Sequence, residues 1–153
     1  MQNINLDTII LIFVGILILV LIALYILIKK SKKPANDFTY MAGEEFEEYC
    51  ARLLYKRGFT NIELTPGSHD YGIDIFAELN GITYAIQCKC YSDTVGIKAV
   101  QEAYAGRDYY DKMIGVVMTN QYFSGPAREF ADKLRILLWD GDYIARLESE
   151  KDC

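Results

Sequence analysis

The chain has 153 residues, enough for one domain plus an appendage, and a net charge of −5. Residues 34–153 carry 20 acidic and 12 basic side chains, and this balance of −8 argues against a general binder of polyanions. The sequence has no P-loop, no G-x-G-x-x-G and no G-x-S-x-G. An ATPase, a dinucleotide enzyme and a serine hydrolase are therefore disfavoured, and no nucleotide cofactor is expected.

Cysteine spacing argues against zinc. The chain has four cysteines, of which Cys88 and Cys90 form a C-x-C, and His69 is its single histidine. Nothing supplies the second pair of ligands that a structural zinc site needs. We expect the cysteines to be reduced and mostly buried, as in a cytosolic domain.

The N-terminal part contains an uncharged apolar run of 20 residues, Ile9 to Ile28, after a polar segment at 1–8. As a helix it would be about 30 Å long, the thickness of a bilayer core. A cleaved signal peptide would need a basic start, a shorter apolar core and a small-residue cleavage site, and the sequence shows none of these. The pattern predicts one transmembrane helix over 9–28.

Charge around this run predicts its orientation. Residues 29–40 form a linker whose first five positions include four lysines, whereas residues 1–8 contain no lysine or arginine. Because basic residues flank the cytoplasmic end of a membrane helix, we expect the N-terminus outside and the following domain in the cytoplasm. The sequence predicts a single-pass protein of a bacterial inner membrane or a plasma membrane.

Residues 41–148 have the periodicities of one α/β domain, and 149–153 are expected to be a disordered tail. We expect a helix over 42–57, strands over 60–64, 73–79 and 82–90, a helix over 94–111, a strand over 113–118, a helix over 126–135, a strand over 136–139 and a short final helix. The order α-β-β-β-α-β-α-β predicts an antiparallel hairpin followed by β-α-β crossovers, a mixed sheet flanked by helices on both faces.

The hairpin carries the most informative residues. Asn80-Gly81 joins its two strands, and both residues tolerate the positive φ of a type I′ turn. Antiparallel pairing then brings Asp74, at the start of the first arm, beside Gln87 and Lys89, at the end of the second. Residues two apart on a strand share a face, so Gln87 and Lys89 project side by side.

A carboxylate, an amide oxygen and an ammonium on one face suit metal-assisted chemistry on a phosphate. The two oxygens are hard ligands for Mg²⁺, and the lysine would orient an attacking water and stabilise charge developing on phosphorus. The alternative is an ordinary hairpin with a polar wet face. It explains the alternation but not a lysine flanked by two cysteines in an apolar strand.

These residues resemble a known family. Asp-Tyr-Gly-Ile-Asp at 70–74 followed by Gln-Cys-Lys at 87–89 resembles the catalytic domain of Mrr-type restriction endonucleases, of the PD-(D/E)xK nuclease superfamily, in the branch with Gln-x-Lys. Matching pieces in the family's order lie at 43–47, 55–59, 95–102, 117–123 and 139–142. The resemblance runs from about residue 43 to 144 and implies a restriction-endonuclease-like fold.

The resemblance implies a role for each site residue. Asp74 and the side-chain oxygen of Gln87 would bind Mg²⁺, or Mn²⁺ in its place, together with the main-chain carbonyl of Cys88. Lys89 would position the attacking hydroxide. Glu45 would complete the metal shell through water. An alternative for Glu45 is that it and its neighbouring glutamates only favour the start of a helix.

Three further residues are expected near the substrate. Asp70 matches an aspartate that the family carries before Gly-Ile-Asp, and Gln101 matches a polar position near the site in related nucleases. His69 is expected to be structural or close to the substrate, since a His-Asp metal phosphohydrolase would need further histidines. For Gln101, an exposed helix position with no role is an equal alternative.

The sequence therefore predicts a membrane-anchored, Mg²⁺-dependent endodeoxyribonuclease that acts on DNA and leaves 5′-phosphate and 3′-hydroxyl ends. Cleavage of both strands would need two sites and hence a homodimer. The alternative is a catalytically weak or inactive module of the same fold that holds DNA or a protein at the membrane, and the acidic balance of the domain favours it.

Overall fold

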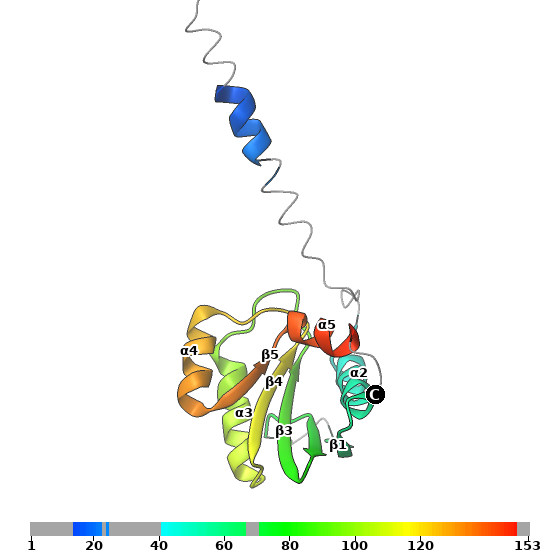
Figure 1. Ribbon diagram of the computed structural model, residues 1–153. Coiled ribbons are helices and arrows are strands. Elements are labelled where there is room, and N and C mark those ends of the chain that lie inside the picture. Colours follow the sequence, from blue (N-terminus) through cyan, green and yellow to red (C-terminus); the bar gives the residue numbers. More distant parts are fainter. Residues whose placement is uncertain (1–13, 23, 25–40, 67–70, 150–153) are drawn as a thin grey trace, which may run out of the picture. The chain divides into compact units, whose positions relative to one another are not determined.

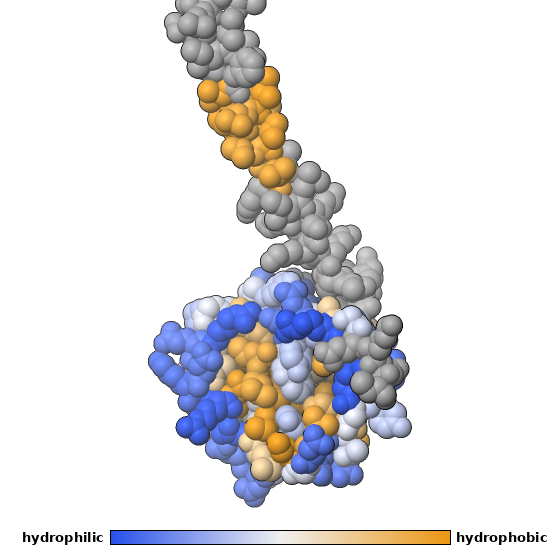
Figure 2. All heavy atoms as spheres, viewed as in Figure 1, coloured by the Kyte–Doolittle hydropathy of each residue, from blue (hydrophilic) through white to orange (hydrophobic). Residues whose placement is uncertain are grey.

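The computed structural model describes residues 14–22, 24, 41–66 and 71–149. The chain divides into two compact units, Met1–Lys33 and Pro34–Cys153. Residues 14–22 and Leu24 are helical, and their large hydrophobic side chains are all exposed; they are coloured hydrophobic in Figure 2. Within the described residues no helix is both long and apolar enough to span a membrane. The rest of the predicted 9–28 helix lies outside the described residues.

The second unit contains a mixed sheet in the order β1-β2-β3-β4-β5 (Figure 1). Its strands are β1 Thr60–Leu64, β2 Ile75–Leu79, β3 Ile82–Lys89, β4 Ile114–Thr119 and β5 Ile136–Trp139. The pairs β1–β2 and β2–β3 are antiparallel, whereas β3–β4 and β4–β5 are parallel. The predicted hairpin followed by crossovers is thus confirmed.

Helices cover both faces of this sheet, as predicted. They are α2 Gly43–Lys56, α3 Ile97–Tyr109, α4 Gly125–Leu134 and α5 Gly141–Ser149. Helices α2 and α5 pack on one face, where the core includes Phe46, Leu54, Ile86 and Ile144. Helices α3 and α4 pack on the other face around a second core that includes Val100 and Val117. Figure 2 shows hydrophobic residues over the strands on the face in view, bordered by hydrophilic ones.

The turn of the hairpin is as the sequence predicts. Asn80 and Gly81 have φ values of 53° and 79°, the positive pair that a type I′ turn requires. The register runs from Ile75 opposite Ile86 to Leu79 opposite Ile82. Strand β2 begins two residues later than the predicted 73–79 run, although Asp74 N still donates to Ile86 O at 2.9 Å.

Two helix starts show what the sequence did and did not reveal. Helix α3 begins at Ile97 and not at 94, because Val95 forms an isolated parallel bridge with Phe123. Helix α4 has Pro126 in its first turn as predicted, and the Ser124 hydroxyl caps it by accepting a hydrogen bond from Ala127 N at 3.3 Å. The Val95 bridge was not visible in the hydrophobic pattern because it is a single-residue contact.

Gly106 is the point where α3 approaches the loop that leads into β2. A β-carbon there would lie 2.3 Å from Ile73 Cγ1 and 2.9 Å from the Tyr71 carbonyl oxygen. We predict that Gly106→Ala destabilises the protein by about 1–3 kcal/mol, because overpacking must push this loop away from the helix. Denaturant unfolding of the full chain measures it.

Gly43→Ala is the matched control, since nothing lies within 4 Å of a β-carbon at that helical position. It should be neutral or stabilising by up to about 1 kcal/mol, as alanine is the better helix former. Equal stabilities of the two variants would show that α3 and the loop are not packed as described.

Candidate active site

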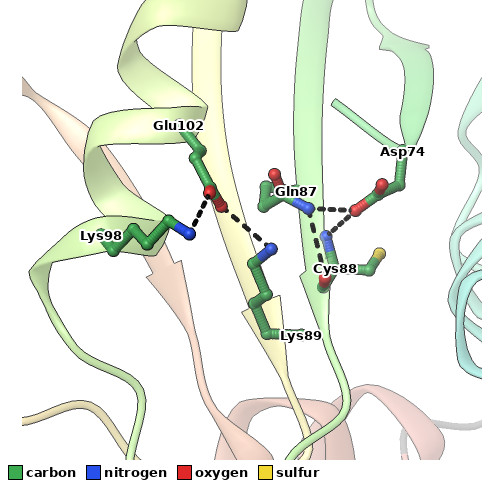
Figure 3. A network of polar contacts seen from close by, with 6 residues as sticks. All are labelled: Asp74, Gln87, Cys88, Lys89, Lys98 and Glu102. Atoms are coloured by element: carbon green, nitrogen blue, oxygen red, sulfur yellow. Dashed lines mark hydrogen bonds and ion pairs between the residues drawn. The ribbon is translucent and has the colours of Figure 1, made fainter. Parts of the chain in front are cut away.

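The carboxylate of Asp74 joins the two arms of the hairpin. Its Oδ2 accepts a hydrogen bond from Cys88 N at 2.6 Å and another from Gln87 Nε2 (Figure 3). Asp74 is only 7% exposed, so its charge is held by these donors inside the domain. The hairpin register places Asp74 opposite the end of β3, and the predicted meeting of Asp74 with Gln87 is confirmed.

Gln87 is buried, and of its two amide atoms only the nitrogen forms hydrogen bonds within the described residues. Nε2 donates to Asp74 and, at 3.3 Å, to the Cys88 carbonyl. No group in the described ranges donates to Gln87 Oε1, although this oxygen is buried. Since buried polar atoms are rarely left without a partner, this orphaned oxygen marks the amide as a candidate ligand.

Gly72 allows the loop before Asp74 to approach this amide. Its φ is 79°, and a β-carbon there would lie 2.8 Å from Glu102 Cβ and 3.1 Å from Gln87 Oε1. Glycine is therefore needed for both the backbone conformation and the space. The loop, the hairpin and α3 meet at this residue.

The side chain of Lys89 points toward α3, where it pairs with Glu102, an acid that was not among the predicted site residues. Its Nζ lies 2.9 Å from Glu102 Oε2, and Lys98 Nζ lies 3.7 Å from Glu102 Oε1. Figure 3 shows Glu102 and Lys89 turned toward one another in the space between α3 and β3, while the amide nitrogen of Gln87 turns toward Asp74. The side chain of Lys89 is 19% exposed, so it keeps access to solvent.

The environment of Lys89 keeps its ammonium protonated. Burial by itself would lower the pKa, but the hydrogen bond and charge of Glu102, with smaller effects of Tyr91 and Asp74, raise the pKa above its usual value. Lys89 is therefore a cation at neutral pH and not a general base.

The thiol of Cys88 lies on the opposite face of the sheet, in the core beneath α2. A hydrogen bond with the Cys50 thiol, followed by burial, raises the pKa of Cys88. Only the main chain of this residue faces the site: its N–H binds Asp74 and its carbonyl accepts from Gln87. A ligand role for that carbonyl stays a prediction.

The glutamates of α2 are arranged differently from the expectation. Glu45 is exposed, and its Oε2 accepts a hydrogen bond from Ala42 N at 3.0 Å, so its carboxylate caps its own helix. Glu47 is half-buried, and its charge contributes to the raised pKa of Cys88. A metal role for Glu45 stays untested.

Of the other expected residues, only Gln101 is described by the structure. Gln101 is exposed on α3, one position before the acid that contacts Lys89. His69 and Asp70 lie outside the described residues. The sequence does contain a signal for Glu102, because the buried residues Ala99, Ala103 and Gly106 form a stripe of small side chains that it borders. Small residues let a helix approach a sheet closely, and an acid beside them then reaches the strand.

A metal at this site would depend on few protein ligands. Throughout the described residues, no three His, Cys, Asp or Glu side chains are grouped to hold an ion. The donors at the site are nevertheless the hard oxygens that Mg²⁺ prefers: one carboxylate, one amide oxygen without a donor and one main-chain carbonyl. The residues fit a weakly held, partly hydrated cation.

The mixed five-stranded sheet flanked by helices is the restriction-endonuclease-like fold. Residues 38–147 match the family described as restriction endonuclease, the Mrr catalytic domain. The chain therefore belongs to this family. No curated protein matched the sequence.

Three solved structures resemble the domain. A protein of unknown function, AF1548, is 27% identical with a TM-score of 0.55. The match covers 63% of this chain and 57% of the AF1548 chain. The DNA modification-dependent restriction endonuclease AspBHI is 20% identical with a TM-score of 0.51, and the match covers 67% of this chain and 30% of the AspBHI chain. The restriction endonuclease MspJI, solved in complex with a 27-mer oligonucleotide, is 21% identical with a TM-score of 0.51. The match covers 67% of this chain and 26% of the MspJI chain. The chain thus spans less than two thirds of each of these proteins.

We predict that Glu102→Gln destabilises the protein at neutral pH by about 1–3 kcal/mol, the usual contribution of a hydrogen bond between charged groups. In the wild type the raised pKa of Lys89 adds stability that is full below the unfolded value of about 10.4 and is lost as pH rises through the folded value. Unfolding free energies measured from neutral to strongly alkaline pH test this, and the variant should lack that alkaline loss.

The exposed pair Lys133–Glu129 supplies the control, with side chains 69% and 73% exposed. Glu129→Gln should change stability by no more than about 1 kcal/mol. If Glu102→Gln behaved in the same way, the ion pair would not hold Lys89 as described.

Proposed function

We propose that this protein is a membrane-anchored, divalent-metal-dependent endodeoxyribonuclease that hydrolyses DNA phosphodiester bonds to 5′-phosphate and 3′-hydroxyl ends. One observation carries the proposal: Gln87 is hydrogen-bonded to Asp74, and Lys89, two residues further along β3, projects from the same face and pairs with Glu102 of α3. The family assignment supports it, and MspJI, a structural neighbour, was solved with an oligonucleotide.

Asp74 and Gln87 are the residues that would hold Mg²⁺ or Mn²⁺. The amide nitrogen of Gln87 now faces Asp74, so half a turn of the amide would bring its unpartnered oxygen beside the carboxylate. When bound, the cation would polarise the phosphate and help ionise water. Because Gln is neutral where a second carboxylate is common in the superfamily, we expect weak binding and a need for about millimolar metal.

Lys89 acts on the phosphate as a hydrogen-bond donor and a positive charge. Its ammonium would hold the attacking water and a non-bridging oxygen, and stabilise the negative charge that grows as the P–O3′ bond breaks. The water oxygen becomes part of the 5′-phosphate, and the leaving O3′ takes up a proton. Glu102 positions Lys89, since it is the acid in contact with the ammonium.

We predict that Asp74→Asn and Lys89→Ala each lower plasmid nicking in Mg²⁺ by about 100-fold or more, the cost of removing a key charge-stabilising group. Asn is preferred to Ala at 74 because it keeps an acceptor for Cys88 N–H, which would otherwise be buried without a partner. Initial nicking rates of the full chain are measured at several Mg²⁺ concentrations.

Lys133→Ala on α4, whose lysine pairs only with an exposed glutamate, should nick at the wild-type rate. Wild-type rates for both site variants would exclude this site as the catalytic centre. A chain that binds DNA and never cleaves it would instead favour the binding-module alternative, which the acidic balance of the domain already supports.

The membrane part of the proposal rests on the N-terminal run. Residues 9–28 are uncharged and apolar, lysines follow at 29–33, and the described helical residues expose their hydrophobic side chains all along the segment. We propose that this segment anchors the domain at the cytoplasmic face of a membrane.

We predict that Ile16→Lys with Leu19→Lys releases the protein from membranes, since each lysine near the centre of a membrane helix costs about 2.5–3.5 kcal/mol. Alkaline carbonate extraction of cell membranes measures the released fraction. Ile16→Val with Leu19→Ile should stay in the membrane fraction. Extraction of the wild type itself would refute the anchor without affecting the nuclease proposal.

A further inference from the structure

Aromatic rings gather beside the candidate site at the C-terminal end of α3. Tyr71 stacks on Tyr109 with ring centroids 4.0 Å apart. Tyr110 meets Tyr71, Tyr109 and Phe76 edge-on, at centroid distances of 6.2, 4.9 and 4.8 Å. We call Tyr71, Phe76, Tyr109 and Tyr110 the aromatic cluster.

The stacked pair of this cluster is not part of the core. Tyr71 is 55% exposed and Tyr109 is 59% exposed, whereas Phe46 in the core is 0% exposed. A hydrogen bond with Tyr71 raises the pKa of Tyr109, so its hydroxyl stays neutral. Each ring covers one face of the other, and more than half of each side chain remains exposed to solvent.

The cluster borders the residues proposed to act on phosphate. Phe76 is two residues after Asp74, and its neighbours Ile75 and Ala77 point into the core beneath α2, so Phe76 lies on the face of β2 that α3 covers. Tyr71 is next to Gly72, which lies against Gln87 and Glu102. Along α3 the seven residue steps from Glu102 to Tyr109 rise by about 10 Å. A strand whose phosphate lay at Lys89 would thus bring a neighbouring nucleotide to the rings.

A lysine beside the rings supplies positive charge. Lys112 Nζ lies 4.9 Å from the centroid of the Phe76 ring. It forms no ion pair with another residue of the described ranges, in contrast to Arg107, which pairs with Asp108 at 2.7 Å. Aromatic faces with a nearby cation are the combination by which proteins bind single-stranded nucleic acid.

We infer that the aromatic cluster stacks an unpaired base of the DNA strand whose phosphate lies at Asp74 and Lys89. This inference rests on the proposed function and names its substrate class, single-stranded or locally opened DNA. In a duplex each base is already stacked within the helix, so its ring face is not available to the tyrosines. Stacking on an exposed tyrosine is sequence-tolerant, because every base has a π-face.

Binding of oligonucleotides without metal tests this inference separately from catalysis. The full chain in detergent is titrated, in EDTA and at low salt, into a labelled single strand, the same strand with a run of abasic sites, and the duplex. The wild type should bind the intact strand about 5- to 100-fold more tightly than the abasic strand, which corresponds to one stacked base. It should bind the duplex more weakly than the intact strand.

Tyr71→Leu with Tyr109→Leu should remove the difference between intact and abasic strands. Tyr71→Phe with Tyr109→Phe should keep it, since the rings remain. The control is Tyr55→Leu, a tyrosine of α2 that is 75% exposed, and it should behave like the wild type.

A wild type that binds intact and abasic strands equally, or neither, overturns the inference, as does an unchanged preference in the leucine variant. Rings that serve as a docking surface for a protein would give this negative result. A chain that never cleaves DNA but shows a tyrosine-dependent preference for bases would refute the proposed function and keep this inference.

Discussion

The hydrogen bond from Cys88 N to Asp74 Oδ2 is the contact on which the site depends. β2 begins only after Asp74, so the backbone N–H of Cys88 would be buried without a partner if the carboxylate did not accept it. The bond ties the entry of β2 to the end of β3, where Gln87 contacts the same carboxylate and Lys89 pairs with Glu102 of α3. The Asp74 carboxylate therefore has two roles: it accepts a hydrogen bond from a backbone N–H of β3, and it is the central acid of the proposed site.

Charge balance explains how a buried acid and a lysine coexist in this small domain. Asp74 is held by two donors, and Lys89 by Glu102 with Lys98 on the far side. The ammonium therefore remains charged in spite of its burial, and it lies at the edge of the site where solvent reaches it. Such an arrangement favours charge stabilisation over proton abstraction by the lysine.

The sequence predicted those parts of the structure that local patterns determine. Asn80-Gly81 set the turn, the turn set the register, and the register brought Asp74 to Gln87. Glu102 was missed because its contact with Lys89 depends on how closely α3 approaches the loop at 71–73, where Gly106 and Gly72 leave room. The stripe of small residues on α3 indicates a close approach but does not show which strand residue the neighbouring acid reaches. For Glu45 the sequence left two roles open: its hydrogen bond from Ala42 N–H fits the helix-start role, and its metal role stays a prediction.

The most direct test of the account is an NMR titration of the full chain with Mg²⁺ that follows side-chain amide signals. We predict a saturable shift of the Gln87 amide, as its oxygen turns toward the cation, together with a shift of the Cys88 backbone N–H. The Asn61 amide, which donates to Glu78 at 2.9 Å on β1, should not move. A Gln87 signal that stays in place at millimolar Mg²⁺ would contradict a metal centre at this hairpin.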